Sequence, residues 1–112
     1  MIYELRIYDA TPGKMKALTD RFVNHTLGLF KKHGIRTTLF LEPVIGTSNQ
    51  LIYLVEWENM AEREEKWGAF QTDPEWISAR SASEKDGSLT AKVTNSLLRE
   101  SPDIMKIIRG NA

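Results

Sequence analysis

The sequence contains no cysteine among its 112 residues. This absence excludes disulfide bonds, a thiol nucleophile and thiolate metal sites. It fits a reducing compartment, so we expect a cytoplasmic protein. The opening segment from Met1 to Arg6 lacks the basic start and the long apolar run of a signal peptide. No stretch is both long enough and apolar enough to cross a bilayer, so we expect no membrane span.

An excess of charge of either sign is also missing. Fifteen basic and fifteen acidic side chains give a formal net charge of zero, so no long-range field attracts a polyanion. The pair Lys31–Lys32 is too short a basic cluster to bind phosphates, and we expect no nucleic-acid partner. Since the sequence holds no Ser-His-Asp set, glycine-rich phosphate loop or cluster of metal ligands, it predicts neither a metal nor a cofactor.

The patterns that are present alternate between strand and helix, over a length that suits one domain. Residues Ile2 to Tyr8 alternate between apolar and polar side chains and predict a first strand. Thr11 and Pro12 then predict the start of a helix, with Thr11 as its cap. An apolar stripe continues this helix until His33-Gly34 ends it, and its members are Met15, Leu18, Phe22, Thr26 and Leu29.

Two further strands and a second helix follow. Residues Ile35 to Leu41 are rich in β-branched and apolar side chains, and Leu51 to Trp57 are apolar on both faces, as in an inner strand. Asn59 and Glu62 have the spacing of a capping box and start the next helix. Asp73-Pro74 interrupts that helix and restarts it, with the aspartate as cap and the proline in the first turn.

Residues Thr90 to Leu98 alternate again and predict a fourth strand. The resulting order βαββαβ predicts an α+β domain of ferredoxin-like topology over residues 1–100. In this fold a four-stranded antiparallel sheet carries its helices on one face. We expect a loose C-terminal tail over residues 101–112, although four of its apolar side chains could dock elsewhere: Ile104, Met105, Ile107 and Ile108.

The second face of such a sheet would stay bare. We expect Glu4, Arg6 and Tyr8 on that face, because the opposite side of the first strand is apolar. One of the two faces of the third strand, Ile52-Leu54-Glu56 or Leu51-Tyr53-Val55-Trp57, must line it too. An apolar patch of this kind marks an interface, so the sequence predicts that two sheets pack together in a closed homodimer.

Short motifs occur in a set order along nearly the whole chain: Ile2-Tyr3-Glu4-Leu5-Arg6-Ile7-Tyr8, Pro12-Gly13-Lys14, Lys32-His33-Gly34, Ile45-Gly46, Asn49-Gln50, Ala61-Glu62-Arg63, Asp73-Pro74-Glu75-Trp76, Asn95 and Leu98-Arg99. In their order and spacing the chain resembles the NIPSNAP family, which belongs to the dimeric α+β barrels. The resemblance implies a ferredoxin-like protomer and a homodimer whose two sheets form a barrel. It implies no reaction, because the family has no settled biochemical activity.

Relatives in the wider barrel group include cofactor-free monooxygenases, haem-degrading enzymes and stress-responsive binding proteins. One position in the third strand departs from the family pattern. Many members carry a histidine and then a tryptophan there, where this chain has Tyr53 and Val55. A tyrosine titrates near ~10 and is a poor base at neutral pH, so any proton-carrying role of that histidine is vacant here.

Arg6 and the two histidines each allow a structural and a functional interpretation. An inward-facing Arg6 must pair with a carboxylate, Glu4 or Glu56 of either subunit, or else anchor an anionic or carbonyl group of a ligand. The histidines are eight residues apart, about 12 Å along a helix, and cannot share a metal. His33 ends the helix and favours its dipole. We expect His25 to face the space between helix and sheet, as a helix-flank residue or as a proton carrier.

The aromatic side chains either form the core or wall a flat hydrophobic ligand site. The sequence favours a site for a small apolar or aromatic molecule, with these candidate ligand-binding residues: Arg6, Tyr8, Tyr53, Trp57 and Trp67. Cofactor-free oxygenase-type chemistry is a further option, with His25, Arg6 and Tyr53 as candidate catalytic residues. The alternative is a non-enzymatic protein-interaction module, in which the barrel edge or the tail recruits a partner. The pattern leaves open whether the protein is an enzyme.

Overall fold

The computed structural model describes residues 1–110. Four strands form one antiparallel sheet in the order β2-β3-β1-β4. The strands are β1 (Ile2–Ala10), β2 (Arg36–Leu41), β3 (Gln50–Trp57) and β4 (Thr90–Arg99). This strand order, with helices after β1 and β3, is the ferredoxin-like topology that the sequence predicts.

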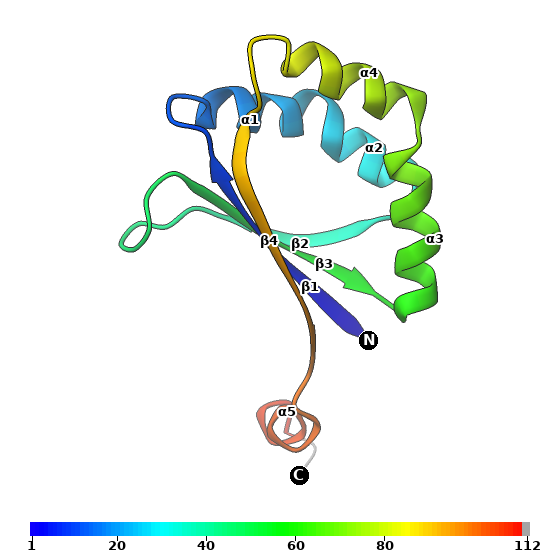
Figure 1. Cartoon of the computed structure of the whole chain (residues 1–112). Coiled ribbons are helices and arrows are strands. Elements are labelled where there is room, and N and C mark those ends of the chain that lie inside the picture. The colour runs from blue at the N-terminus through cyan, green and yellow to red at the C-terminus, as the bar shows by residue number, and fades with distance from the viewer. Residues whose placement is uncertain (111–112) are drawn as a thin grey trace.

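Two helical segments cover one face of the sheet (Figure 1). The first consists of α1 (Met15–Arg21), the π-helix η1 (Phe22–Thr26) and α2 (Leu27–Lys32). The second consists of α3 (Met60–Gln71) and α4 (Pro74–Ser83). A further helix, α5 (Pro102–Ile108), follows β4 and lies apart from these two segments (Figure 1). A π-turn is wider than an α-turn, and η1 gives the first segment one such turn in its middle.

The first helix begins later than the sequence predicts. Lys14 precedes α1 as its N-cap residue, and the Lys14 amide donates to the Thr11 carbonyl at 2.8 Å. Gly13 has a positive φ of 79°, a conformation that glycine adopts readily. The Thr11 hydroxyl does not cap the helix but donates to the Ser88 carbonyl at 2.8 Å. Thr11 therefore holds the β1–α1 turn against the start of β4.

The core lies between the helices and the sheet. The predicted stripe of the first helix is confirmed, since Leu18, Phe22, Thr26 and Leu29 are all buried there and Met15 packs partly buried against them. On β3 the side chains of Tyr53, Val55 and Trp57 are fully buried beneath the helices. Burial of each large apolar side chain contributes roughly 1.5–3 kcal/mol, so this layer is the main source of folding energy.

Both predicted caps of the second helical segment are confirmed. Asn59 precedes α3, and its side-chain oxygen accepts from the Glu62 amide at 2.9 Å. Asp73 precedes α4, and its Oδ1 accepts from the Glu75 amide at 2.8 Å. A lost cap costs about 1 kcal/mol, so each cap fixes where its helix begins.

The Asp73 carboxylate also joins the two helical segments. This carboxylate is buried. Its Oδ2 accepts from Lys32 Nζ at 2.9 Å and lies 2.7 Å from His33 Nε2, at the end of α2. The hydrogen bonds from Lys32 and His33 hold the pKa of Asp73 well below its usual value, so the charged form is the one that stabilises this junction.

The bare face of the sheet is apolar, but the expectation that it carries Glu4, Arg6 and Tyr8 is wrong. These three side chains are buried against the helices, where they contact Arg63, Trp67 and Phe22 respectively. Of the two faces of β3, the one with Ile52 and Leu54 is the uncovered one. The bare apolar face is centred on Tyr3, Leu5, Ile7, Leu41, Ile52, Leu54 and Leu98, and its polar members include Glu56 on β3 and Thr94 and Ser96 on β4.

The tail expected over residues 101–112 contains a helix instead of loose chain, and residues 111 and 112 lie outside the described part. Glu100 anchors α5, because it accepts from Arg109 Nη1 and from the Tyr3 hydroxyl, each at 2.9 Å. The isoleucines of α5 are exposed. In residues 1–110, no helix is both long and apolar enough to cross a membrane.

Candidate functional site

Glu4 is the centre of a polar network buried between the sheet and α3. Its side chain has no exposed surface. Its two carboxylate oxygens accept hydrogen bonds from four side chains, namely Arg6 Nη1 at 2.9 Å, Trp57 Nε1 at 3.1 Å, Arg63 Nε at 2.8 Å and Asn95 Nδ2 at 3.0 Å. These donors belong to β1, β3, α3 and β4. One carboxylate thus connects three strands with a helix.

The donors around Glu4 decide its charge. Burial alone raises the pKa of a carboxyl group, but hydrogen bonds from Arg63, Asn95, Trp57 and Arg6 outweigh that effect and lower the pKa of Glu4 to about 2. Glu4 is therefore ionised at neutral pH. The two arginines together carry two positive charges against this one negative charge, so the network keeps a net positive charge.

Arg6 uses all three of its guanidinium nitrogens within this network. Its Nε donates to the Tyr53 hydroxyl at 3.0 Å, its Nη1 to Glu4, and its Nη2 to the Tyr8 hydroxyl at 3.4 Å. The guanidinium carbon also lies 4.6 Å from the ring centre of Trp67. The predicted pairing of Arg6 with Glu4 is confirmed within a single chain, so the structural interpretation of Arg6 holds.

Tyr53 is a buried hydrogen-bonding group rather than a base. Its hydroxyl lies 2.8 Å from the Tyr8 hydroxyl, and Phe40 stacks on its ring at a centroid distance of 4.6 Å. Burial, followed by the neighbouring Tyr8, raises the pKa of Tyr53 well above its usual value. A phenol in this state stays protonated at neutral pH and can donate or accept a hydrogen bond, but it does not abstract protons.

A row of aromatic rings runs from this network along the helical layer. Trp57 lies 6.5 Å from Trp67, Trp67 lies 5.2 Å from Phe70, and Phe70 lies 4.8 Å from Trp76, each measured between ring centres. The structure therefore brings together the five residues predicted to bind a ligand, which are Arg6, Tyr8, Tyr53, Trp57 and Trp67. Trp76 extends their cluster to the start of α4.

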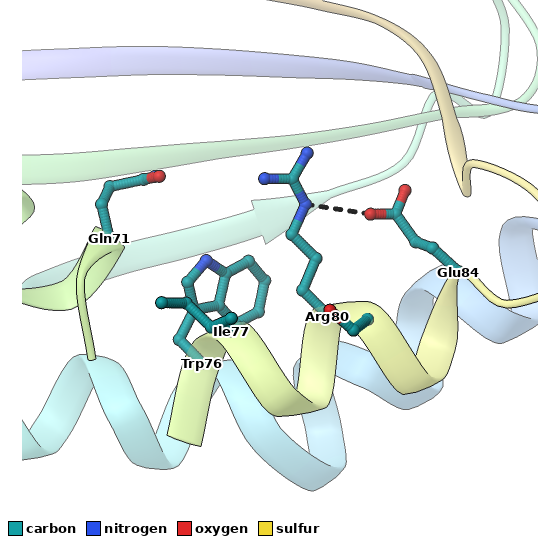
Figure 2. Close-up of a pocket in the computed structure, with 6 residues that line it drawn as sticks. Gln71, Trp76, Ile77, Arg80 and Glu84 are labelled. Carbon is teal, nitrogen blue, oxygen red and sulfur yellow. Dashed lines mark hydrogen bonds and ion pairs between the residues drawn. The ribbon is translucent and has the colours of Figure 1, made fainter. Parts of the chain in front are cut away.

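A cavity of about 440 Å³ opens beside Trp76. Its lining residues are Gln71, Trp76, Ile77, Arg80, Ser81 and Glu84. Figure 2 shows Trp76, Arg80 and Glu84 projecting from the α4 segment toward the sheet. The Arg80 Nε donates to Glu84 Oε1 at 2.9 Å. None of the five predicted ligand-binding residues lines this cavity, so the predicted cluster forms the packed interior next to it.

His25 lies away from the cluster, and the expectation that it faces the space between helix and sheet is wrong. Its side chain is exposed on η1. It borders a groove of about 350 Å³ together with Asp20, Asn24, Ala79 and other residues of the helical layer. The buried positions of the first segment are held by Phe22 and Thr26, which leaves His25 on the outside.

Sequence reasoning missed several residues that the structure places in or near the site. Arg63 and Asn95 complete the shell of Glu4, and both belong to the family motifs, but sequence reasoning assigned no role to either of them. Trp76 and Arg80 are four residues apart, a spacing that places both on one helix face and could have indicated a shared site. In the described range 1–110, no three histidine, aspartate or glutamate side chains lie close enough to hold a metal ion.

The fold and this helix-side site define a ferredoxin-like α+β protein with a buried arginine–carboxylate network. The family model for NIPSNAP matches residues 3–103. The chain therefore belongs to the NIPSNAP family, as the sequence motifs suggested. No protein of curated function matches the chain.

Solved structures agree with this assignment. Protein Atu4242 from Agrobacterium tumefaciens superposes with a TM-score of 0.79 at 21% identity, over 90% of this chain and 94% of that one. An uncharacterised NIPSNAP domain protein from Burkholderia xenovorans gives 0.79 at 18% identity, over 90% and 95%. A protein from Nitrosomonas europaea, provisionally assigned as an antibiotic biosynthesis monooxygenase, gives 0.62 at 8% identity, over 90% and 99%. At these identities the likeness establishes the fold alone.

Replacement of Glu4 by glutamine should strongly destabilise the protein. Glu4→Gln removes the charge that Arg6 and Arg63 share and turns one acceptor into a donor, which leaves buried cations without compensation. We expect the free energy of unfolding in urea to fall by about 3–5 kcal/mol. Glu65→Gln on the exposed side of α3 is the matched control and should change it by less than ~0.5 kcal/mol. A loss below ~1 kcal/mol for Glu4→Gln would contradict the role of the network.

The same carboxylate should make stability depend on acid pH. The pKa of Glu4 is about 2 in the folded chain against an ordinary value of 4.5, so the unfolded chain binds the proton first. The free energy of unfolding should therefore fall as the pH drops from about 4.5 to about 2, and it should be flat with respect to Glu4 above that window. The measurement is the urea midpoint at closely spaced pH values.

Glu4→Gln provides the control for this pH profile. Its slope between about pH 4.5 and 2 should be shallower than that of the wild type, because one titrating group is gone. The slope that remains comes from other carboxylates whose pKa values the fold lowers, such as Asp73 and Glu100. Identical slopes in the two proteins would show that Glu4 does not keep its charge in the folded state.

Proposed function

We propose that the chain works as a cytoplasmic homodimer in which two bare sheet faces pack together. The supporting observation is that this face has an apolar centre on β1 and β3, bordered by Leu41 and Leu98, although the helices leave it uncovered. Leu41 and Leu98 at its borders are 48% and 46% exposed, and the centre holds Leu5, Ile7 and Leu54. Water contact with such a surface is unfavourable, and a second copy offers a face of the same shape and chemistry.

Leu54→Arg should break this dimer. The substitution places a charge at the centre of the bare apolar face, where a partner sheet would desolvate it. We expect the variant to be a folded monomer in analytical ultracentrifugation and in native mass spectrometry, whereas the wild type gives a dimer in both. Val23→Arg is the control, because Val23 is 66% exposed on η1 in the helical layer, and its dimer should persist. A monomeric wild type would contradict the proposal.

We further propose that the protein binds a small aromatic or apolar molecule on the helix side of the sheet. The observation that carries this proposal is the cavity at Trp76, which continues the aromatic row from Trp57. The buried cluster around Arg6 connects to the cavity through the rings of Trp67, Phe70 and Trp76. Ligand pockets are typically apolar and aromatic with a few placed polar groups, and this cavity combines Trp76 and Ile77 with Arg80.

Binding fits these residues better than oxygenase-type chemistry. The Nitrosomonas europaea protein supports that chemistry by fold alone, at 8% identity. His25 is exposed away from the cluster, Arg6 is fully engaged in hydrogen bonds, and burial keeps Tyr53 protonated. No candidate catalytic residue therefore offers a free base at the cavity, and the cavity's own groups are suited to holding a ligand.

Filling the cavity should abolish ligand binding. We would titrate the ¹⁵N-labelled protein with phenol, benzamide and benzoate and follow the three indole N–H signals. At least one compound should shift the Trp76 signal. Gln71→Phe fills the cavity from the end of α3 and should remove that shift, whereas Glu65→Phe on the same helix should leave it intact. Absence of any shift in the wild type would contradict the site.

The second candidate function is a protein-interaction module, which α5 supports. Ile104, Ile107 and Ile108 of this helix are 59%, 67% and 69% exposed. Ile107 and Ile108 follow Ile104 by three and four residues, so both lie on the same side of the helix as Ile104. If the dimer gives no indole shift with any of the three compounds, the protein-interaction module becomes the better-supported function.

A further inference from the structure

The cavity beside Trp76 is rich in unused hydrogen-bond donors. The hydrogen bonds formed among residues 1–110 engage the Nε of Arg80 with Glu84 but leave its two terminal nitrogens and the Trp76 indole N–H without a partner. Figure 2 shows the terminal nitrogens of Arg80 turned away from Glu84 and toward the sheet, and the Trp76 ring alongside. Gln71 adds a side-chain amide at the far end. The Gln71 carbonyl oxygen, the Ser81 hydroxyl and the Glu84 carboxylate also line the cavity, so the donors that favour an acceptor group are those of Arg80 and Trp76.

The charges behind the cavity are also unbalanced. Arg21 from α1 is only 7% exposed, and its guanidinium carbon lies 5.3 Å from the ring centre of Trp76. The nearest carboxylate oxygen, Glu84 Oε1, is 3.9 Å from Arg21 Nη1, and Arg80 already binds that same oxygen. The Nε of Arg21 is buried and has no hydrogen-bond partner among the described residues. Two guanidinium groups therefore share one carboxylate, which leaves a net positive charge behind Trp76. Arg21 itself lines the neighbouring groove, and its Nη1 also donates to Ser83 Oγ at 3.2 Å.

The state of Arg21 agrees with this imbalance. Burial lowers the pKa of Arg21, and the carboxylate of Glu84 offsets that effect only in part. A buried cation without full compensation is costly, and an anion placed nearby would relieve that cost. The hydrogen-bond donors and the charges therefore both favour an anionic ligand.

We infer that the cavity selects small aromatic compounds that carry a carboxylate or a comparable planar oxyanion. This inference rests on the proposed small-molecule site and names its ligand class. The two terminal nitrogens of Arg80 match a carboxylate in a bidentate pair, which Arg forms with high geometric specificity. The aromatic ring of the ligand would lie against Trp76 and Ile77, and its negative charge would balance the second guanidinium.

Benzoate and benzamide provide a matched pair of probes, because they have the same ring and nearly the same shape but differ by one charge. Titrations of the full-length protein would follow the Trp76 indole signal. Benzoate should bind the wild type at least about ten times more tightly than benzamide, equivalent to roughly 1.4 kcal/mol. Arg80→Gln should weaken benzoate by about tenfold and leave benzamide unchanged, while Arg80→Lys should give an intermediate value. Arg99→Gln, which removes an exposed arginine at the end of β4, is the control.

Glu84→Gln separates charge recognition from structural damage. It removes the carboxylate that competes for Arg80 and Arg21, so benzoate binding should become tighter, by roughly three- to tenfold. Damage to the cavity would weaken both probes instead. Equal affinities for benzoate and benzamide, unchanged by Arg80→Gln, would overturn the anion preference and leave the small-molecule site standing. If neither probe nor phenol shifted Trp76, both the inference and the site would be wrong.

Discussion

A carboxylate without contact to water must be fully hydrogen-bonded, and this requirement at Glu4 organises the whole domain. Its four donors come from β1, β3, α3 and β4, so the sheet must bring its strands into register and α3 must lie over β3 before Glu4 is satisfied. A half-satisfied network would be worse than an apolar core. The network therefore selects one arrangement of the helices over the sheet, while the aromatic layer supplies most of the stabilisation.

The patterns of local spacing predicted the architecture well. The strands, the helical stripe from Leu18 to Leu29, and the caps at Asn59 and Asp73 all depend on neighbours within a few residues, and the structure confirms them. The C-terminal helix was not predicted, because its isoleucines are exposed and form no buried stripe that a sequence pattern could indicate. The start of α1 was misplaced, because Thr11 binds the carbonyl of Ser88, which is distant in sequence.

The orientation of β1 could not be deduced from alternation alone. The usual rule places the apolar side of a strand toward the helices, but Tyr3, Leu5 and Ile7 lie on the uncovered face instead. The rule fails because the polar side finds its compensation in Arg63 and Asn95, which only the tertiary fold brings near. The five candidate ligand-binding residues do lie together, but whether they bind a ligand stays a prediction. The cavity at Trp76 and the exposure of His25 were not predicted.

The π-helix η1 lets the first helical segment carry one residue more than a regular α-helix of the same length. A π-turn holds one residue more than an α-turn, so deletion of a single residue between Phe22 and Thr26 would restore regular α geometry. The flanking helices would keep nearly the same orientation, because the wider turn absorbs the extra residue. Arg21 would stay beside Trp76, and only the side chains of the turn itself would shift. The turn can therefore change in length while α1 and α2 keep their packing on the sheet.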